Sequence, residues 1–259
     1  MFFTKKRTDG ERDACGYANL VDMHSHVLPA VDDGSESVEK SLEMLRLSYS
    51  QGVRKMVATP HFYPHSMNPS KFLEHREEAV KALAEAVAKK KALGEELPDV
   101  YLGAEVGYFD GISRSSAVPE LCLVGTRILL VEMPFERWSE SCVNELSTLK
   151  VKGFRPVVAH YDRYHSYQER GILERLVDDG IGIQLNAEAF LKFGTKRKAL
   201  GWISAGLVDF LGSDCHNMTN RMPNLSDAAE IIEKSLGADC VERLMENATA
   251  GLERADIIC

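Results

Sequence analysis

Short apolar runs alternate with longer amphipathic stretches along this chain, and that alternation limits the possible folds most. Helical periodicity marks the stretches 37–52, 70–94, 139–153, 169–180, 195–206, 225–237 and 239–248. The apolar runs lie at 19–26, 54–61, 100–105, 127–132, 154–160, 181–186 and 208–216. Strands that alternate with helices are joined by helical crossovers, so they run parallel. Seven such strands favour a closed or nearly closed α/β barrel, although spacing alone leaves a doubly wound sheet open.

The length of the chain agrees with such a barrel. Its 259 residues suit one α/β barrel or two small domains of another class. The sequence has no internal repeat and no low-complexity linker, so we expect a single domain over 20–259. The polar segment 1–19 lacks the continuous apolar stretch of a signal peptide, and we interpret it as an N-terminal lead-in whose order stays open.

Composition excludes several classes of protein. Hydrophobic residues make up 44% and charged residues 27%, which excludes a disordered chain. No apolar run reaches the ~18–20 residues that cross a bilayer, so we expect no membrane insertion. The six cysteines form no CxxC pair, which is typical of reduced thiols in the cytoplasm. Nothing in the sequence indicates an oligomeric state.

Acidic residues outnumber basic ones, which gives a net charge of 31 − 39 = −8. A negative surface argues against nucleic acid as a general partner. Any phosphate group that binds this protein must therefore meet local cations or metal ions.

Nearly every apolar run ends on a side chain that binds metals or titrates. In α/β barrels the carboxyl ends of the strands meet at one mouth, where active sites are built. Carboxylates and imidazoles crowded there are costly unless cations hold them together. The side chains at or just after the run ends are His24, His26, His61, Glu105, Glu132, His160, Asn186, Asp214 and His216.

Spacing within two of these runs favours chelation. Side chains two residues apart on a strand point to the same face. His24 and His26 therefore share one face, as do Asp214 and His216, which turns the intervening Cys215 away. Adjacent Asp32 and Asp33 follow the first strand, and one of them completes the set; we take Asp33 and leave Asp32 as the alternative.

These candidates exceed what one ion of four to six ligands can use, so we expect two or three ions that share a bridging carboxylate. Mixed nitrogen and oxygen ligation without thiolate suits manganese, iron or zinc. The candidate metal ligands are His24, His26, Asp33, His61, Glu105, Glu132, His160, Asp214 and His216.

Two arginines lie just past candidate ligands. Arg163 follows His160, and Arg221 follows His216. A guanidinium matches the oxygens of a phosphate and keeps its charge. In an acidic protein, this placement indicates an anionic group on the substrate.

Taken in order, the motifs DMHSHVLPAVDDG, ATPHF, GAE, VE, AHYDRY and GSDCHN resemble the PHP (polymerase and histidinol phosphatase) superfamily. Within it, the chain is most similar to the bacterial manganese-dependent protein-tyrosine phosphatases that act on tyrosine kinases of capsule and exopolysaccharide synthesis. The resemblance spans residues 22–217, most of the chain.

This resemblance implies a distorted (β/α)7 TIM-like barrel, a trinuclear site that is usually active with Mn²⁺, and hydrolysis of phosphotyrosine in proteins. It also implies that the nine candidate metal ligands bind the ions and that Arg163 and Arg221 bind the phosphate. We expect a hydroxide that bridges two ions to attack phosphorus, with His216 or Asp214 available to protonate the leaving group.

Several alternatives stay open. A small-molecule phosphatase of the histidinol-phosphate type would use the same metal cluster with another pocket. A non-catalytic, metal-bearing docking module would not need the full ligand set. A nuclease fits the cluster but not the net charge.

A thiol-dependent phosphatase is suggested by the spacing Cys215-x5-Arg221. However, no glycine lies between these two residues to form a phosphate-cradling loop. The neighbouring Asp214 also disfavours a thiolate. We therefore interpret this spacing as coincidence.

Overall fold

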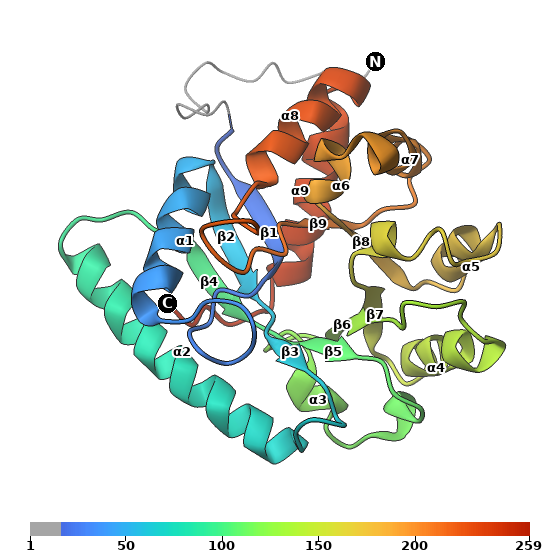
Figure 1. Ribbon diagram of the computed structural model, residues 1–259, viewed down its shortest axis with the longest axis horizontal. Helices are drawn as coiled ribbons and strands as arrows, with labels where there is room; N and C mark the ends of the chain where they lie inside the picture. Colours follow the sequence, from blue (N-terminus) through green and yellow to red (C-terminus); the bar gives the residue numbers. More distant parts are fainter. Residues whose placement is uncertain (1–16) are drawn as a thin grey trace.

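The computed structural model describes residues 17–259, and over that range the chain forms a mixed α/β fold around a curled parallel sheet (Figure 1). Each pairing between two strands of the described part is parallel, in the orders β1-β2-β4 and β3-β5-β6-β7-β8-β9, and Ile257 adds an isolated antiparallel bridge to β4. The strands are β1 (Leu20–Ser25), β2 (Val53–Ala58), β3 (His61–Phe62), β4 (Asp99–Leu102), β5 (Glu105–Gly107), β6 (Ile128–Glu132), β7 (Arg155–Val158), β8 (Gly182–Asn186) and β9 (Phe210–Gly212).

The curl brings the first strand beside the segment that follows the last one. Ser25 forms a parallel bridge with Cys215, and the amide of His26 donates to the carbonyl oxygen of Cys215 at 2.9 Å. The amide of Asp214 donates to the carbonyl oxygen of His24 at 2.8 Å. The two ends of the described sheet system thus meet where candidate site residues lie.

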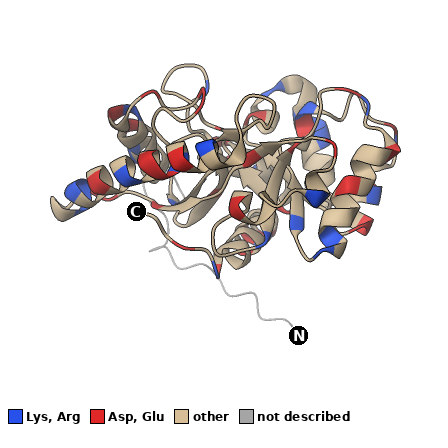
Figure 2. Cartoon of the chain, turned by 90° about the horizontal axis from the view of Figure 1, so that it is seen from below, with Lys and Arg blue, Asp and Glu red and all other residues tan. Residues whose placement is uncertain are grey.

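Helices cover the outer face of the strands (Figure 1). The longest, α2, spans 24 residues and mixes acidic and basic side chains along its surface (Figure 2), as a solvated helix does. The helices are α1 (Val38–Ser50), α2 (Pro69–Ala92), α3 (Val118–Leu121), α4 (Glu140–Val151), α5 (Ile172–Asp178), α6 (Glu188–Leu191), α7 (Phe193–Ser204), α8 (Leu225–Leu236) and α9 (Ala238–Leu252). None of the described helices is both long enough and apolar enough to cross a membrane.

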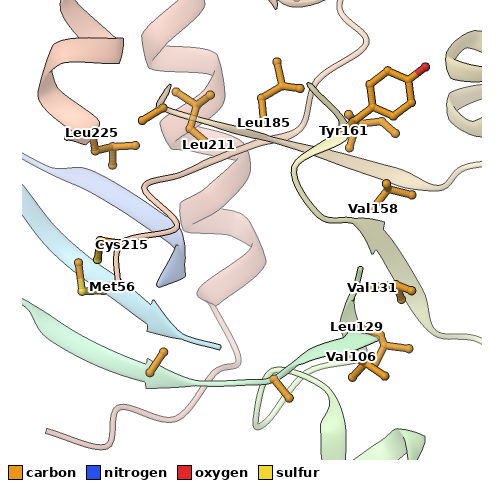
Figure 3. Packing of buried hydrophobic residues seen from close by; sticks show 14 of the residues in the cluster. Met56, Val106, Leu129, Val131, Val158, Tyr161, Leu185, Leu211, Cys215 and Leu225 are labelled. Atoms are coloured by element: carbon orange, nitrogen blue, oxygen red, sulfur yellow. The ribbon is translucent and has the colours of Figure 1, made fainter. Parts of the chain in front are cut away.

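Apolar residues fill both faces of the sheet. Between strands and helices, the main cluster includes Met56, Val131, Leu211 and Leu225 (Figure 3). A second cluster lies on the opposite face of the strands, because its residues alternate along them with those of the main cluster, and it leaves a small void among its side chains. The lining of that void includes Met23, Val57, Leu123, Ile128, Leu130, Val157 and Phe210.

Two expected strands break where the sequence predicted continuous runs. The runs 54–61 and 100–105 were expected to end on His61 and Glu105, but these residues instead begin β3 and β5. Pro60 has no N–H to donate to a ladder, so it interrupts the first run. After the interruption, the Glu105 amide donates to the carbonyl oxygen of Pro60 at 3.1 Å.

Short elements between the strands were not expected from the sequence, notably α3, α6 and the 3-10 turns Ile112–Arg114 and Tyr161–Arg163. The lead-in assigned to 1–19 falls mostly outside the described residues. Its last part is docked, because Tyr17 is buried and its hydroxyl donates to Glu233 at 2.5 Å.

Candidate active site

Strand β1 places two imidazoles side by side. The Nε2 atoms of His24 and His26 lie 3.1 Å apart, and neither residue is exposed. The pairing of β1 with β2 shifts register between Asp22 and Ser25, an irregularity of the kind that re-aims side chains beside active sites. Asp22 is buried beneath them and accepts hydrogen bonds from the amides of His24 and Ser213.

Glu105 occupies the centre of the site and is fully buried. Its Oε2 atom lies 3.1 Å from His24 Nε2, 3.3 Å from His26 Nε2 and 3.0 Å from His61 Nδ1. Its Oε1 atom lies 2.6 Å from His160 Nε2. One carboxylate that faces four imidazoles is the arrangement that a bridging ligand requires.

A second group lies beside Glu105, at the more exposed edge. Asp33 Oδ1 lies 3.6 Å from His61 Nε2 and 3.4 Å from His216 Nε2, and its side chain is 67% exposed. Asp32 has a different place: it accepts from His26 Nδ1 at 2.7 Å and from the His61 amide at 2.8 Å. Asp32 therefore orients a ligand candidate, whereas Asp33 points an oxygen at the group.

Two candidate metal ligands have a left-handed backbone conformation, which residues other than glycine rarely adopt. His160 has φ 31° and Asp214 has φ 52°, and both are buried. Such conformations cost free energy and collect at functional sites. They place His160 beside Glu105 and Asp214 Oδ1 3.3 Å from His26 Nε2.

Both arginines converge on Asp214. Arg163 Nη2 donates to Oδ2 at 2.7 Å, and Arg221 Nη2 donates to Oδ1 at 2.8 Å. Asn186 Nδ2 donates to Oδ2 at 2.7 Å. The two guanidinium groups are about a third exposed, so the same cations also face the mouth of the site.

Sequence reasoning missed two residues that position the site. Gln184 Oε1 lies 3.1 Å from His24 Nδ1 and accepts from the His160 amide at 2.6 Å. A signal for it existed, because a buried glutamine interrupts the apolar run of β8. The Tyr63 hydroxyl donates to Glu132 Oε2 at 2.6 Å and lies 3.0 Å from His61 Nδ1. No pattern in the sequence marked Tyr63.

Charge explains why these groups tolerate burial together. Burial opposes the charged form of His26, but a hydrogen bond to Asp214 holds its pKa well above the usual value. Burial also opposes ionisation of Glu105, yet the charge on His24 keeps its pKa well below the usual range. Burial lowers the pKa of His216 to about 3, and the charge of His26 acts in the same direction.

The donor set fits divalent metal ions. Buried atoms without a hydrogen-bond partner include Glu105 Oε2 and His216 Nε2, both of which face other ligand candidates. Among the described residues, three groups bring their ligand atoms within 4.8 Å of one another. These groups are His26, Asp33, His61 and His216; His24, His26 and Glu105; and His61, Glu105 and Glu132. His160 and Asp214 contact these groups from one side.

Cys215 lies outside this site. It is fully buried in the main apolar cluster with Met56 and Leu225 (Figure 3). Burial raises the pKa of its thiol, as does the neighbouring Asp22. A protonated thiol that faces the core does not act as a nucleophile. The Cys215-x5-Arg221 spacing therefore does not mark a catalytic cysteine.

Comparison with known proteins agrees with this geometry. The family model "Capsular polysaccharide synthesis, CpsB/CapC" matches residues 20–253. The tyrosine-protein phosphatase YwqE of Bacillus subtilis is 32% identical over 235 residues, 88% of this chain and 90% of its own length. The tyrosine-protein phosphatase CpsB of Streptococcus agalactiae is 29% identical over 245 residues, 90% and 98% of the two chains.

A solved structure supports the same relationship. It belongs to the work on YwqE from Bacillus subtilis and CpsB from Streptococcus pneumoniae, described as metal-dependent tyrosine phosphatases. It superposes with a TM-score of 0.77 at 28% identity and covers 92% of this chain and 96% of the other. The motif resemblance is thereby confirmed, and the chain belongs to the CpsB/CapC family of capsular polysaccharide synthesis.

Proposed function

We propose that this chain is a metal-dependent protein-tyrosine phosphatase. One observation supports the proposal most: Glu105 lies among four imidazoles, with two arginines on the adjacent Asp214. The first arrangement suits a cluster of ions that share a carboxylate. The second places cations where a phosphate bound to that cluster needs them.

We assign metal binding to the nine residues that the sequence singled out, with Asp33 preferred over Asp32. Bound divalent ions would supply Lewis acidity there and lower the pKa of a water molecule that attacks phosphorus. Asp32, Gln184 and Tyr63 orient the ligands through the hydrogen bonds described above. The assigned ligands are His24, His26, Asp33, His61, Glu105, Glu132, His160, Asp214 and His216.

Arg163 and Arg221 hold the phosphate and offset the charge that develops on its equatorial oxygens. Each donates to Asp214 through Nη2, which leaves other N–H groups for a ligand. The pKa of His216 is about 3 and that of Asp214 lies well below its usual value, so both suit ligands better than acids. A tyrosine phenolate, with a pKa of ~10, needs little help from an acid to leave.

We also propose the finer description of the fold, a distorted (β/α)7 barrel. The proposal counts β2 with β3 and β4 with β5 as one strand each, because only two residues separate the members of each pair. We propose Mn²⁺ as the ion, in two or three sites. The proposed substrate is a phosphotyrosyl tyrosine kinase of polysaccharide synthesis, and the proposed location is the cytoplasm.

The test is phosphate release from a phosphotyrosyl peptide under three conditions. Chelator-stripped enzyme, the same enzyme with Mn²⁺ restored, and untreated enzyme with a thiol alkylator are compared. We expect activity to vanish on stripping, return with Mn²⁺ and ignore the alkylator. Activity that survives stripping but dies on alkylation would overturn the proposal, and turnover of histidinol phosphate alone would move the substrate to small esters.

A further inference from the structure

Most of the exposed apolar side chains in the described part of the chain follow the strand ends that carry the candidate active site. Eight large hydrophobic residues are strongly exposed in the described part of the chain. Five of them follow the carboxyl ends of β6, β7, β8 and β9, where the candidate active site lies. These five form what we call the apolar rim: Phe135, Tyr167, Leu191, Phe193 and Met222.

The rim reaches the site itself. The Phe135 ring is 51% exposed, stacks beside His160 at 6.2 Å with an interplanar angle of 19°, and packs on Tyr164 at 5.0 Å. Tyr167 lies four residues after Arg163, and Met222 directly follows Arg221. Phe135 therefore touches a group assigned to the metal ions, and Tyr167 and Met222 lie close in sequence to the two arginines assigned to the phosphate.

Exposure of this kind needs a reason. Phe193 is fully exposed, and the side chains of Tyr167, Leu191 and Met222 are between 43% and 49% exposed. Clustered apolar residues at the surface mark interaction sites, whereas single ones need no explanation. Of the other three exposed residues, Leu93 and Val151 lie at the ends of α2 and α4 that lead back into strands, and Ile257 forms a bridge with Tyr101 of β4.

Contact with the candidate site, and not charge, indicates what the rim binds. Near the rim, Arg137 is paired with Glu169, and Arg175 forms two hydrogen bonds of 2.8 Å with Glu140. Basic residues at 192 and 196–198 also lie beside Phe193 in the sequence. The contact of Phe135 with His160 places the rim next to the bound phosphate, where the rest of the substrate must lie.

We propose that the apolar rim binds the polypeptide on either side of the phosphotyrosine, and that it selects apolar or aromatic flanking residues. The inference rests on the proposed phosphatase function, because it takes the phosphate to lie between Arg163 and Arg221. A phosphotyrosine held there must lay its neighbouring residues over the segments that follow β6, β7, β8 and β9. The rim thereby distinguishes a protein substrate from a small phosphate ester.

The experiment measures both binding and turnover. Two phosphotyrosyl peptides of equal length and charge carry either leucine and phenylalanine or serine and glycine beside the tyrosine. Their affinities for Mn²⁺-loaded enzyme are measured with non-hydrolysable phosphonate analogues, and kcat/KM is measured with the phosphate esters. p-Nitrophenyl phosphate reports turnover without flanking residues.

We expect the wild-type enzyme to prefer the apolar peptide roughly tenfold, mainly through Kd and KM. The double variant Tyr167→Ser/Phe193→Ser should reduce that preference to less than about threefold. The matched control Leu93→Ser/Val151→Ser removes two exposed apolar residues elsewhere and should keep the preference. All four side chains are exposed, so neither variant threatens folding.

Three results would overturn the inference: equal affinity of the wild type for both peptides, an equal effect of the rim and control variants, or a rim variant that changes only the oligomeric state in light scattering. The last result would assign the rim to a second copy of the chain. Failure of the proposed function looks different, because the apolar preference would persist in binding while no aryl phosphate, p-nitrophenyl phosphate included, is hydrolysed.

Discussion

The two ends of the strands bury opposite kinds of side chain. From the amino ends to the middle of the strands the interior is apolar, as with Met23, Leu130 and Phe210. Just past the carboxyl ends the buried side chains are charged or ligating, as with His160 and Asp214. Apolar burial stabilises a fold, whereas buried charges cost free energy unless they are paired or bind metals. The comparison teaches that stability and chemistry are separated along the same strands, often by one or two residues.

Loss of the central carboxylate should have the largest effect at the carboxyl end. Glu105→Gln keeps the shape of the side chain but removes the charge that faces four imidazoles. We expect phosphatase activity to fall at least about a thousandfold, together with weaker Mn²⁺ binding. Steady-state kinetics and metal analysis of the dialysed protein measure both. A loss of less than about tenfold would contradict the assigned role.

The matched change at the amino end should affect stability instead. Phe210 is 1% exposed and lines the small interior void, so Phe210→Ala enlarges a cavity. We expect the free energy of unfolding to fall by about 3–5 kcal/mol. Urea denaturation measures this, and the activity of each folded molecule should stay within about threefold of the wild type. If Phe210→Ala kept its stability but lost activity, the claim that this part of the strands serves stability and not chemistry would be wrong.

Metal binding should depend on pH in a direction that the charges determine. The raised pKa of His26 means that the metal-free protein holds this proton near neutral pH. The proton must leave before the imidazole binds an ion, so Mn²⁺ affinity should rise with pH, by about tenfold per unit for each proton displaced. Titration calorimetry in two buffers of different ionisation enthalpy counts the protons. If Mn²⁺ binding released no proton at pH 7, the conclusion that His26 is protonated in the metal-free protein and binds the ion would be wrong.

A smaller effect is expected at the edge of the cluster. Tyr63→Phe removes the hydroxyl that donates to Glu132 and contacts His61, while the ring remains. Hydrogen bonds to charged groups contribute about 1.5–3 kcal/mol, and solvent takes over part of this one. We therefore expect Mn²⁺ affinity to fall roughly three- to tenfold, measured by competition with a chelator. The control Tyr49→Phe alters an outlying tyrosine on α1 and should leave the affinity unchanged.

Much of this site could be predicted from the sequence because ligand types recur at strand ends. The apolar runs identified which strands are buried, and their last residues identified His26, Glu132 and His160. The breaks at Pro60 and after Leu102 were not predictable in detail, because tertiary pairing decides where a ladder resumes. Both breaks place a ligand candidate at the start of a short strand.

Residues that orient the ligands were harder to find. Gln184 and Tyr63 act through contacts with segments far away in the sequence. A polar residue inside an apolar run marks Gln184 without naming its partners, and no local pattern marks Tyr63. The choice between Asp32 and Asp33 also depended on geometry. Adjacent carboxylates differ here only in which way the loop turns them, and Asp32 turns toward the His61 amide.

The bridge between Ser25 and Cys215 has a consequence for protein synthesis. Ligands from the first strand meet Asp214 and His216 only after the last strand has docked beside it. A nascent chain from which residues 1–209 have emerged therefore holds His24, Glu105 and Arg163 without Asp214 or Arg221. The candidate site is completed late in synthesis, because it needs residues that follow the last strand of the sheet.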